Sequence, residues 1–353
     1  MQSRSGRRNT TDICKDKKQA VRGCRVRGIP AFCGPYACCQ RHRKGAHMKK
    51  ESFASRLRQN IKKHKGLYLM IIPIVVYYII FCYYPMYGAQ IAFRDYSPKK
   101  GIVGSPWAGL KHFRDFFKSV YFGRLIRNTL SINLKNLIFG FPAPIIFALL
   151  LNEVRWSKFK RTVQTVSYMP HFISTVVIAG MVLQFTATDG FITQIMTLFG
   201  YPKQNLMMNP DLFQPIYVIS DIWQGVGWGS IIYISAISGI NGELYEAARM
   251  DGAGRWKQML YVTLPGILPT IITMFVMRVG NMMNLGFEKI FLLYNSSIYE
   301  TADVISTYVY RKGLVDQSYS FSTAVGLFNS VINLLLLFGA NKFCKRLTDY
   351  SLW

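Results

Sequence analysis

Six long windows without a charged side chain constrain the fold of this chain more than any other feature. They cover residues 66–93, 136–152, 162–188, 222–242, 258–277 and 317–341 of the 353-residue sequence. A helix of roughly 20 apolar residues crosses the hydrocarbon core of a bilayer, and each window is of that order if the second extends back past Lys135. Lipid offers the backbone no hydrogen-bond partner, and the windows lack the alternation of a barrel strand. The sequence therefore predicts an all-α polytopic membrane protein with six transmembrane helices.

Basic side chains outside these windows predict the orientation of the helices. The formal net charge is +26, and residues 1–66 hold roughly 19 basic but only three acidic side chains. Because basic residues collect on the cytoplasmic side of a membrane protein, the N-terminus is predicted to be cytoplasmic. Six crossings return the C-terminus, with Lys342, Lys345 and Arg346, to the same side.

The segment between the first two windows is an exception, because six crossings place it outside although it carries eight basic side chains. Its apolar residues recur at helical spacing, as expected for an amphipathic helix in the headgroup layer. They are Leu110, Phe113, Phe116, Phe117 and Val120. The predicted organisation is a basic cytoplasmic tail at 1–66, a first transmembrane helix at 67–86, an extracytoplasmic loop with this interfacial helix at 87–127, a core of five transmembrane helices at 128–341 and a cytoplasmic tail at 342–353.

The first 47 residues carry five of the seven cysteines and show little hydrophobic periodicity. A zinc site requires paired Cys or His ligands, and only Cys38, Cys39, His42 and His47 come near such spacing. A basic arm for nucleic acid would accompany a folded binding module, which this segment lacks, so we expect no nucleic-acid partner. We favour a third interpretation, in which biosynthesis starts at Met48 and residues 1–47 are absent from the native protein.

A polar loop at 239–265 separates the fourth and fifth windows and is cytoplasmic in the predicted topology. Asn241 can cap a short helix that has Glu243 in its first turn, where a negative charge is favourable. Gly252 and Gly254 can then turn the chain. The loop is therefore predicted to hold a short helix between two membrane helices.

Two small residues, Ala247 and Ala248, would let another backbone approach this short helix closely. A helix held rigidly between two membrane helices could carry a push from a soluble partner into the membrane. On these residues alone, two interpretations stay open: a docking helix and an ordinary surface helix.

Three runs in this loop resemble the EAA loop of ATP-binding-cassette importer permeases, and they follow one another at its spacing. The runs are Glu246-Ala247-Ala248, Asp251-Gly252-Ala253 and Val262-Thr263-Leu264-Pro265. Residues 168–174, 239–245 and 286–290 resemble the carbohydrate-type subgroup that is linked to uptake of complex carbohydrates, and the resemblance covers roughly residues 67–341. Two departures leave the helix and its turn intact: the usual Ile-Pro before the glutamates is replaced by residues 239–242, and position 262 is Val instead of Ile.

This resemblance implies a six-helix type I importer permease fold, like that of the maltose permease, in a bacterial cell membrane. It also implies that the EAA helix docks on a separate ATPase, with the coupling role assigned to Glu246, Ala247, Ala248, Asp251, Gly252, Leu264 and Pro265. The implied partners are a second permease subunit, an ATPase dimer, an extracytoplasmic solute-binding protein, membrane lipid and a carbohydrate substrate, an oligosaccharide or polysaccharide fragment. No Gly is followed by Lys in this chain, and a phosphate-binding Walker A loop needs that pair. ATP and magnesium are therefore expected in the partner ATPase, and this chain is expected to hold no cofactor, metal or catalytic site.

Polar and aromatic side chains within or beside the predicted spans are candidates for a substrate pathway. Amides can hydrogen-bond sugar hydroxyls, and indole rings can stack on sugar rings. The candidates are Gln184, Trp223, Gln224, Trp228, Asn281, Asn284 and Asn329. The same residue types also bond neighbouring helices or mark the membrane interface, so the choice stays open at each position. Hinges are another open choice, because prolines remove backbone donors and glycines loosen packing, although glycine also simply permits close helix packing; the residues are Pro142, Pro144, Pro170, Gly225, Gly227 and Gly229.

Asp221 and Arg278 are ionisable residues inside predicted spans, where a charge is costly and needs a partner or water. A rise of about 1.5 Å per residue places both roughly 12 to 14 Å below the outer surface of the hydrocarbon core. We expect the two residues to pair, or Arg278 to contact the substrate.

Two other classes of membrane protein are alternatives to an ATP-driven importer subunit. A secondary transporter would carry its ion sites within the helices and would need no ATPase. A membrane-embedded enzyme is disfavoured because the sequence shows no catalytic constellation.

Overall fold

The computed structural model describes residues 63–348. The predicted start at Met48, the alternatives for residues 1–47 and parts of both predicted tails lie outside the described residues. Within 63–348 the secondary structure is helical, apart from one isolated antiparallel bridge between Arg94 and Trp107, which confirms the predicted all-α class. The chain divides into two units after Val76, and each is described by itself.

The first helical stretch runs from Lys65 to Phe93, so it extends beyond the predicted end at residue 86. It consists of α3 (Lys65–Tyr78), η3 (Ile79–Tyr83), α4 (Tyr84–Met86) and η4 (Tyr87–Phe93). None of the α3 side chains is buried, as expected of an apolar helix whose solvent is lipid. In the second unit, η4 packs against the C-terminal helix α20 (Tyr319–Thr348).

The loop that follows contains α5 (Gly101–Gly104) and α6 (Lys111–Lys118), and α6 is the predicted amphipathic helix. Phe116 of α6 is buried, and its ring contacts the rings of Phe321 and Phe328 on α20. The apolar face of α6 therefore rests partly on another helix and not only on headgroups. Val120, in contrast, stays exposed.

The second predicted span is one helical stretch from Phe122 to Glu153. It consists of α7 (Phe122–Lys135), the π-helical turn η5 (Asn136–Gly140) and α8 (Pro142–Glu153). A π turn holds one more residue than an α turn and is common at functional sites.

The third window, 162–188, is not one helix, so that prediction is wrong. α9 (Ser157–Tyr168) runs into η6 (Met169–Phe172), where Pro170 lacks the N–H that would continue an α-helix. Ser174 caps the separate helix α10 (Thr175–Thr186), which forms the apolar stretch Thr175–Leu198 together with α11 (Phe191–Leu198).

The central helix α12 (Pro210–Ser238) follows η7 (Leu206–Met208) and is 29 residues long. It packs along α8 and also contacts α9, α18 and η5. Gly227 lies so close to the backbone of Ser167 on α9 that a Cβ at this position would overlap it. This glycine therefore permits close helix packing.

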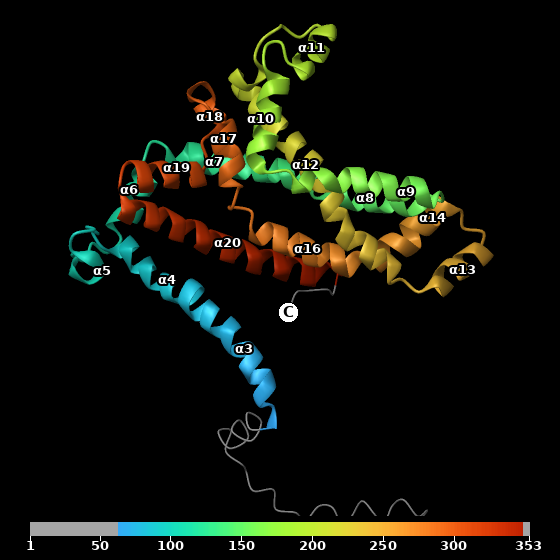
Figure 1. The fold of residues 1–353 in the computed structure, drawn as a ribbon, viewed down its shortest axis with the longest axis horizontal. Coiled ribbons are helices and arrows are strands. Elements are labelled where there is room, and N and C mark those ends of the chain that lie inside the picture. The colour runs from blue at the N-terminus through green and yellow to red at the C-terminus, as the bar shows by residue number, and fades with distance from the viewer. Residues whose placement is uncertain (1–62, 349–353) are drawn as a thin grey trace, which may run out of the picture. The chain divides into compact units, whose positions relative to one another are not determined.

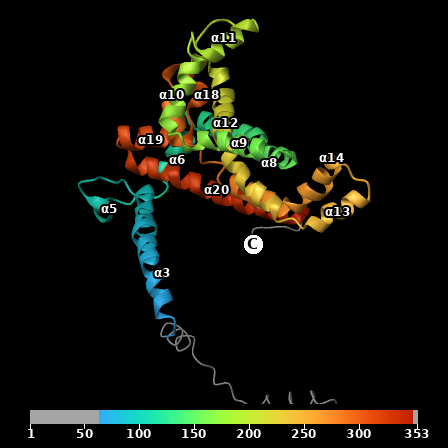
Figure 2. The same ribbon diagram turned by 45° about the vertical axis from the view of Figure 1, so that its right-hand side comes forward.

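The remaining chain forms two series of short helices that lead to the last long helix. The first series is α13 (Gly242–Met250), α14 (Arg255–Gln258), η8 (Met259–Thr263), α15 (Leu264–Gly266) and α16 (Leu268–Gly280). The second is α17 (Phe287–Leu293), η9 (Ser296–Ile298), α18 (Tyr299–Ala302), α19 (Ile305–Tyr310) and η10 (Arg311–Val315). α16 packs along α20, as Figure 1 shows. α13 and α14 form a hairpin beyond the end of α12 (Figures 1 and 2).

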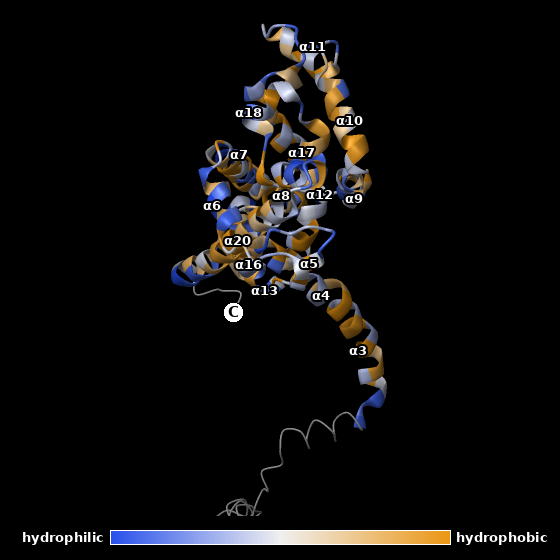
Figure 3. Cartoon of the chain, turned by 90° about the vertical axis from the view of Figure 1, so that its left-hand side faces the viewer, coloured by the Kyte–Doolittle hydropathy of each residue, from blue (hydrophilic) through white to orange (hydrophobic). Residues whose placement is uncertain are grey.

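Four helical stretches in the described chain are long and apolar enough to cross a membrane. They are Lys65–Phe93, Phe122–Glu153, Thr175–Leu198 and Tyr319–Arg346. A fifth results if Arg255–Gly266 and Leu268–Gly280, which meet at 59°, count as one bent span. Hydrophobic residues dominate α3 and α10, whereas hydrophilic residues gather on α6 (Figure 3).

α12, the fourth predicted span, has the length of a transmembrane helix but is too polar to belong to this set. Because α8, α9 and α18 pack against it, much of its surface contacts protein and need not match lipid. Six crossings therefore remain a prediction.

One buried carboxylate connects three elements on the side of α7 that faces α19. Asp303 is fully buried and accepts hydrogen bonds from Arg124 at 3.3 Å and from Arg311 at 2.8 Å. Thr307 donates a third, at 2.9 Å. Two cations and a hydroxyl compensate the cost of burying this charge, and they fix α7 and η10 to α19.

Candidate functional site

The helix predicted for the loop at 239–265 is α13, and its cap is the predicted one. Asn241 Oδ1 accepts a hydrogen bond from the backbone N–H of Glu243 at 3.1 Å. Asn241 Nδ2 donates to the Glu243 carboxylate, also at 3.1 Å. The first turn of α13 is thus fixed by a local interaction that the sequence encodes directly.

The turn after α13 depends on Gly252 and not on Gly254. Gly252 has φ +75°, in the left-handed region that favours glycine, whereas Gly254 has φ −67°. The N–H of Ala253 donates to the carbonyl of Ala248 at 2.9 Å, which closes the end of the helix.

α13 is exposed on most of its surface and buries none of its residues. Glu246 and Ala247 are exposed, and within residues 63–348 no ion pair holds Glu246 or Asp251. The contact to the rest of the chain comes from Tyr245, whose hydroxyl lies 3.0 Å from the buried Thr263 hydroxyl on η8.

The end of the predicted coupling segment lies inside the packed structure. Leu264 packs against a core cluster of α8, α12 and η8 that includes Met259, together with Ile267 at the start of α16. Gly266 lies close to Ile240, since a Cβ at Gly266 would come 2.7 Å from Ile240 Cδ1. The chain just before α13, at Ile240, therefore contacts the chain that follows it, at Gly266. Pro265 is the first residue after Leu264 in α15, a favourable place for proline.

A polar cavity of about 270 Å³ lies between α7, α12 and the segment from α16 to α17. It brings together five of the predicted pathway residues, which are Asp221, Gln224, Arg278, Asn281 and Asn284. It is also lined by polar residues that were not predicted for the pathway, which are Asn133, Asn136, Thr175, Tyr217, Glu288 and Lys289. Amides and charges of both signs can together bind a ligand that is rich in hydroxyl groups.

Asp221 pairs with Lys289 and not with Arg278, so the expected pairing is wrong. Lys289 Nζ lies 3.5 Å from Asp221 Oδ1 and 3.4 Å from Gln224 Oε1. Asn136 Nδ2 donates to the other carboxylate oxygen at 2.6 Å. Lys289 is only 5% exposed and also lies over the ring of Tyr217. Asp221 and Arg278 do line the same cavity, as their similar depths predicted, but the chain turns after Gly280 and α17 brings Lys289 to Asp221.

Arg278 is left with a free guanidinium group in the wall of this cavity. It is exposed, and the described chain offers it no ion pair or hydrogen bond. It also lines a second hollow of about 280 Å³ together with Asn136 and Asp221. Arg278 is therefore available to a ligand in either hollow.

The three asparagines predicted for the pathway differ in their contacts. Asn329 Nδ2 donates to Asn284 Oδ1 at 2.8 Å, so this pair connects α20 to the loop after α16. Asn281 donates to the carbonyl of Met277 at 3.1 Å. Asn281 and Asn284 line the cavity, whereas Asn329 lines a different hollow beside α19.

The predicted tryptophans lie elsewhere. Trp228 stacks on His171 with ring centroids 4.6 Å apart, and it also contacts Phe172 edge to face. Trp223 and Trp228 are both half-exposed, and neither lines the polar cavity. Gln184 does not line it either.

The missed asparagines lie at the π turn. Asn136 is the first residue of η5, and a Cβ on Gly140 would overlap its side-chain amide. Asn133 and Asn136 are three residues apart, so they share a helix face, which is the signal that could have found them.

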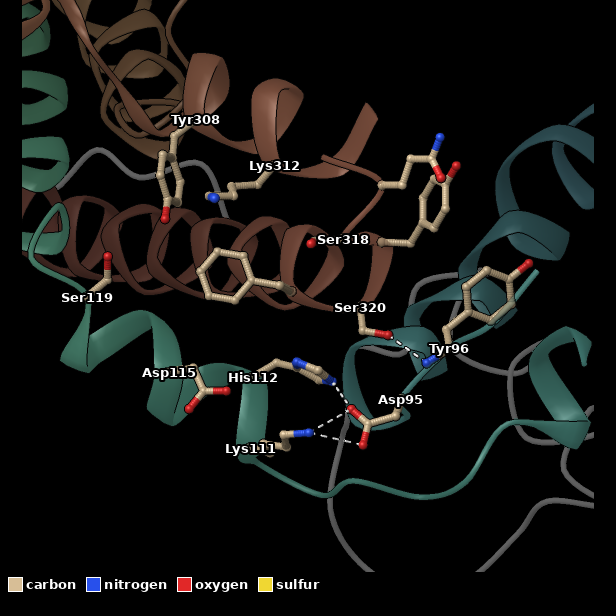
Figure 4. A pocket seen from close by; sticks show the side chains of 13 residues that line it. Asp95, Tyr96, Lys111, His112, Asp115, Ser119, Tyr308, Lys312, Ser318 and Ser320 are labelled. Atoms are coloured by element: carbon tan, nitrogen blue, oxygen red, sulfur yellow. Dashed lines mark hydrogen bonds and ion pairs between the residues drawn. The ribbon is translucent and has the colours of Figure 1, made fainter. Parts of the chain in front are cut away.

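A larger hollow of about 670 Å³ lies between α6, η10 and the start of α20 (Figure 4). Lys111 and His112 both reach Asp95, at 3.2 and 3.0 Å. The backbone N–H of Tyr96 donates to Ser320 Oγ at 2.9 Å. A hydrogen bond to Asp316 raises the pKa of Lys312 in the same wall. The contacts of Asp95 hold the preceding loop to α6, and the hydrogen bond of Tyr96 holds it to α20. No predicted site residue lines this hollow.

Residues 140–349 match the family model described as the binding-protein-dependent transport system inner membrane component. The chain belongs to this family. As a member of the family it is an integral membrane transport subunit.

Curated relatives of this permease extend over most of its length. It is 45% identical over 294 residues to Protein LplB of Bacillus subtilis (strain 168), covering 83% of this chain and 92% of the relative. It is 43% identical over 305 residues to the polygalacturonan/rhamnogalacturonan transport system permease protein YteP of the same organism, covering 86% and 95%.

Solved structures confirm the importer permease fold. A bacterial ABC transporter involved in the import of the acidic polysaccharide alginate contains a chain that matches with a TM-score of 0.77 and 43% identity, covering 83% of this permease and 99% of that chain. A second structure, of a bacterial alginate ABC transporter in complex with an alginate pentasaccharide-bound periplasmic protein, matches with a TM-score of 0.77 and 42% identity, covering 84% and 100%.

Proposed function

We propose that this permease is one membrane subunit of an ATP-driven importer of carbohydrate, an oligosaccharide or polysaccharide fragment. In this proposal a separate ATPase dimer binds ATP and magnesium, and a second permease subunit completes the pathway. An extracytoplasmic solute-binding protein delivers the carbohydrate. The permease lies in a bacterial cell membrane with both termini in the cytoplasm.

Coupling is supported by a series of packed helices that leads from α13 to the polar cavity. Tyr245 on α13 bonds Thr263 on η8, and η8 belongs to the helical stretch Arg255–Gly266. This stretch leads into α16, which carries Arg278 in the cavity wall. A force applied to α13 would reach the cavity through helices, without passing a flexible linker.

The exposed face of α13 suits a docking partner. Glu246 and Ala247 are exposed, and the small Ala247 leaves room for a second backbone. Asp251 and Gly252 shape the turn that follows. We therefore assign the coupling role to Glu246, Ala247, Ala248, Asp251, Gly252, Leu264 and Pro265.

The unpaired guanidinium of Arg278, and not the net charge of the cavity, which also holds the carboxylate of Glu288, favours a carbohydrate that carries a carboxylate. Amides of Gln224, Asn281 and Asn284 can bond hydroxyls, and the free guanidinium of Arg278 can bind a carboxylate in a bidentate manner. One matching structure is described as an importer of an acidic polysaccharide, and one relative as a polygalacturonan/rhamnogalacturonan permease, which supports this substrate class.

Uptake by vesicles that contain the complete transporter tests the coupling proposal. We expect uptake to stop when ATP is removed and not to resume under an imposed ion gradient. Glu246→Lys should abolish uptake, whereas Asp189→Lys, the same charge change in the exposed loop before α11, should not. Uptake driven by the ion gradient alone would instead favour the secondary transporter.

A comparison of substrates tests the substrate class. We expect uptake of an oligogalacturonide to exceed that of the matching neutral galacto-oligosaccharide. Arg278→Gln should lower the ratio of the two uptake rates roughly tenfold. Equal uptake of the two by the wild type would contradict the acidic class and leave the coupling proposal intact.

A further inference from the structure

A hollow of about 730 Å³ lies beside the coupling helix, between the end of α8 and the start of α14. Its wall contains three arginines, Arg155, Arg249 and Arg255, and one carboxylate, that of Glu153. Among the residues that the structure describes, none offers these three guanidinium groups a hydrogen bond or an ion pair. The hollow therefore holds a net positive charge that the chain itself does not compensate.

The two walls of this hollow lie where apolar helices end. The stretch Phe122–Glu153 ends at Glu153, two residues before Arg155. The stretch Arg255–Gly266 begins at Arg255 itself. If these stretches cross the hydrocarbon layer, their ends and the hollow between them lie at the depth of the lipid headgroups.

Two exposed tryptophans support this depth. Trp156 directly follows Arg155 and is 68% exposed, and Trp256 directly follows Arg255 and is 66% exposed. Trp156 is stacked with Phe159, at 6.2 Å between ring centroids. Indole rings next to basic side chains are typical of the membrane–water interface, where the ring contacts lipid and the cation contacts the headgroup.

We propose that this hollow binds the phosphate headgroup of an anionic phospholipid. Guanidinium groups match phosphate oxygens in a bidentate manner, and basic pockets between membrane helices on the cytoplasmic side bind anionic lipid headgroups. Its volume suits a headgroup, because small-molecule sites measure several hundred Å³. The proposal depends on the proposed function only for the placement of this face at the cytoplasmic leaflet.

An acidic segment of the ATPase is a different occupant that the same charges could bind. The lipid is favoured because tryptophans flank the hollow on both walls and because it lies between the ends of two apolar stretches. The exposed Glu246 and Ala247, in contrast, lie outside the wall of the hollow. A bound headgroup would contact Arg249 on α13 and Arg155 after α8, so lipid would connect the coupling helix to the membrane border.

Native mass spectrometry of the purified full-length permease, reconstituted with equal amounts of phosphatidylglycerol and phosphatidylcholine, tests the proposal. We expect the wild type to retain phosphatidylglycerol over phosphatidylcholine by about tenfold or more. The triple variant Arg155→Gln, Arg249→Gln and Arg255→Gln should retain the two lipids about equally.

The control removes the same number of charges from the neighbouring helix α9, through Lys158→Gln, Lys160→Gln and Arg161→Gln. These residues do not line the hollow, so the preference should stay within about twofold of the wild type. A third variant, with lysine at positions 155, 249 and 255, keeps the charge and should keep part of the preference. If the lysine and glutamine variants unfold at the same temperature, the glutamine variant has lost the binding site and not the fold.

Several outcomes would overturn the proposal. The first is equal retention of both lipids by the wild type, and the second is a control variant that loses as much preference as the glutamine variant. Displacement of phosphatidylglycerol by millimolar inorganic phosphate would indicate a site for free phosphate instead. An unchanged lipid preference with lost ATPase co-purification in the glutamine variant would indicate a protein partner. Because lipid retention is measured without transport, a permease that fails to take up carbohydrate but keeps its lipid preference would contradict the proposed function alone.

Discussion

Lys289 Nζ lies 3.5 Å from Asp221 Oδ1, and this ion pair connects the central helix α12 to the short helix α17. Asn136 on η5 donates to the same carboxylate, so three separate segments meet at Asp221. Arg278, which lies at the same cavity, is left free for a ligand. Lys289 is thus held in a structural ion pair, whereas Arg278 stays available to a ligand.

A double-mutant cycle on this pair should show strong coupling. We expect Lys289→Met alone to lower the free energy of unfolding by about 2 kcal/mol, because Asp221 then loses its cation in a partly buried place. Adding Asp221→Asn should restore part of this loss. The matching cycle of Asp221→Asn with Arg278→Gln should be additive, and thermal unfolding in detergent measures both. Stronger coupling to Arg278 than to Lys289 would show that the ion pair is assigned wrongly.

Two neighbouring glycines of α12 should differ sharply in their tolerance of a methyl group. Gly227→Ala places a Cβ against the backbone of Ser167, which cannot rotate away, so we expect a loss of about 3 kcal/mol or a failure to fold. Gly225→Ala meets no atom within 4 Å and should be nearly neutral or slightly stabilising, since alanine favours helix. The melting temperatures of the two variants check this contrast. Equal tolerance would mean that α9 and α12 are farther apart than the structure places them.

The turn after α13 offers a similar contrast in conformation alone. Gly252→Ala forces a side chain into φ +75°, at a cost of about 1 kcal/mol, although open space surrounds the position. Gly254→Ala also meets open space, but its φ of −67° suits any residue, so it should cost little. Hydrogen exchange of the amides at the end of α13 should accelerate several-fold in the first variant and stay unchanged in the second. A faster exchange in both would assign the effect to the added methyl group and not to the backbone conformation.

The hydroxyl of Tyr245 should fix α13 to η8. Tyr245→Phe removes the contact with Thr263 and should destabilise the local attachment of α13 by about 1 kcal/mol. In the complete transporter, we also expect less carbohydrate to be taken up per ATP hydrolysed. Tyr261→Phe is the matched control, because Tyr261 lies in the same stretch and is 77% exposed. If both variants kept the wild-type ratio of uptake to hydrolysis, this hydroxyl would have no part in coupling.

Local signals in the sequence predicted the helix α13 well, because its limits depend on neighbouring residues. The cap by Asn241 and the turn at Gly252 are each encoded within a few positions, and both were predicted. Pro170 was predicted as a possible hinge, but the third window was still taken as one span, because hydropathy averages composition and does not register where the backbone changes direction.

Contacts between distant segments were predicted less well. Polar composition of the spans was enough to find Gln224, Asn281 and Asn284 in the cavity. The calculated depths did bring Asp221 and Arg278 to one cavity, but the partner of Asp221 was missed because Lys289 lies outside the predicted spans, on the segment that follows the turn after Gly280. Trp223 and Trp228 lie on α12 away from this cavity, so their place in the pathway stays a prediction.

The π turn at Asn136–Gly140 joins the two halves of a single span. The turn holds one residue more than an α turn, so deleting one of its residues would replace it by regular α-helix and leave α8 at nearly the same rotation relative to α7. Ile145, Ala148 and Leu149 would then keep their place in the core against α12, whereas the wide turn that begins at Asn136 in the cavity wall would be lost. A single inserted residue therefore lets one continuous helix present an amide to the cavity above and an apolar face to the core below.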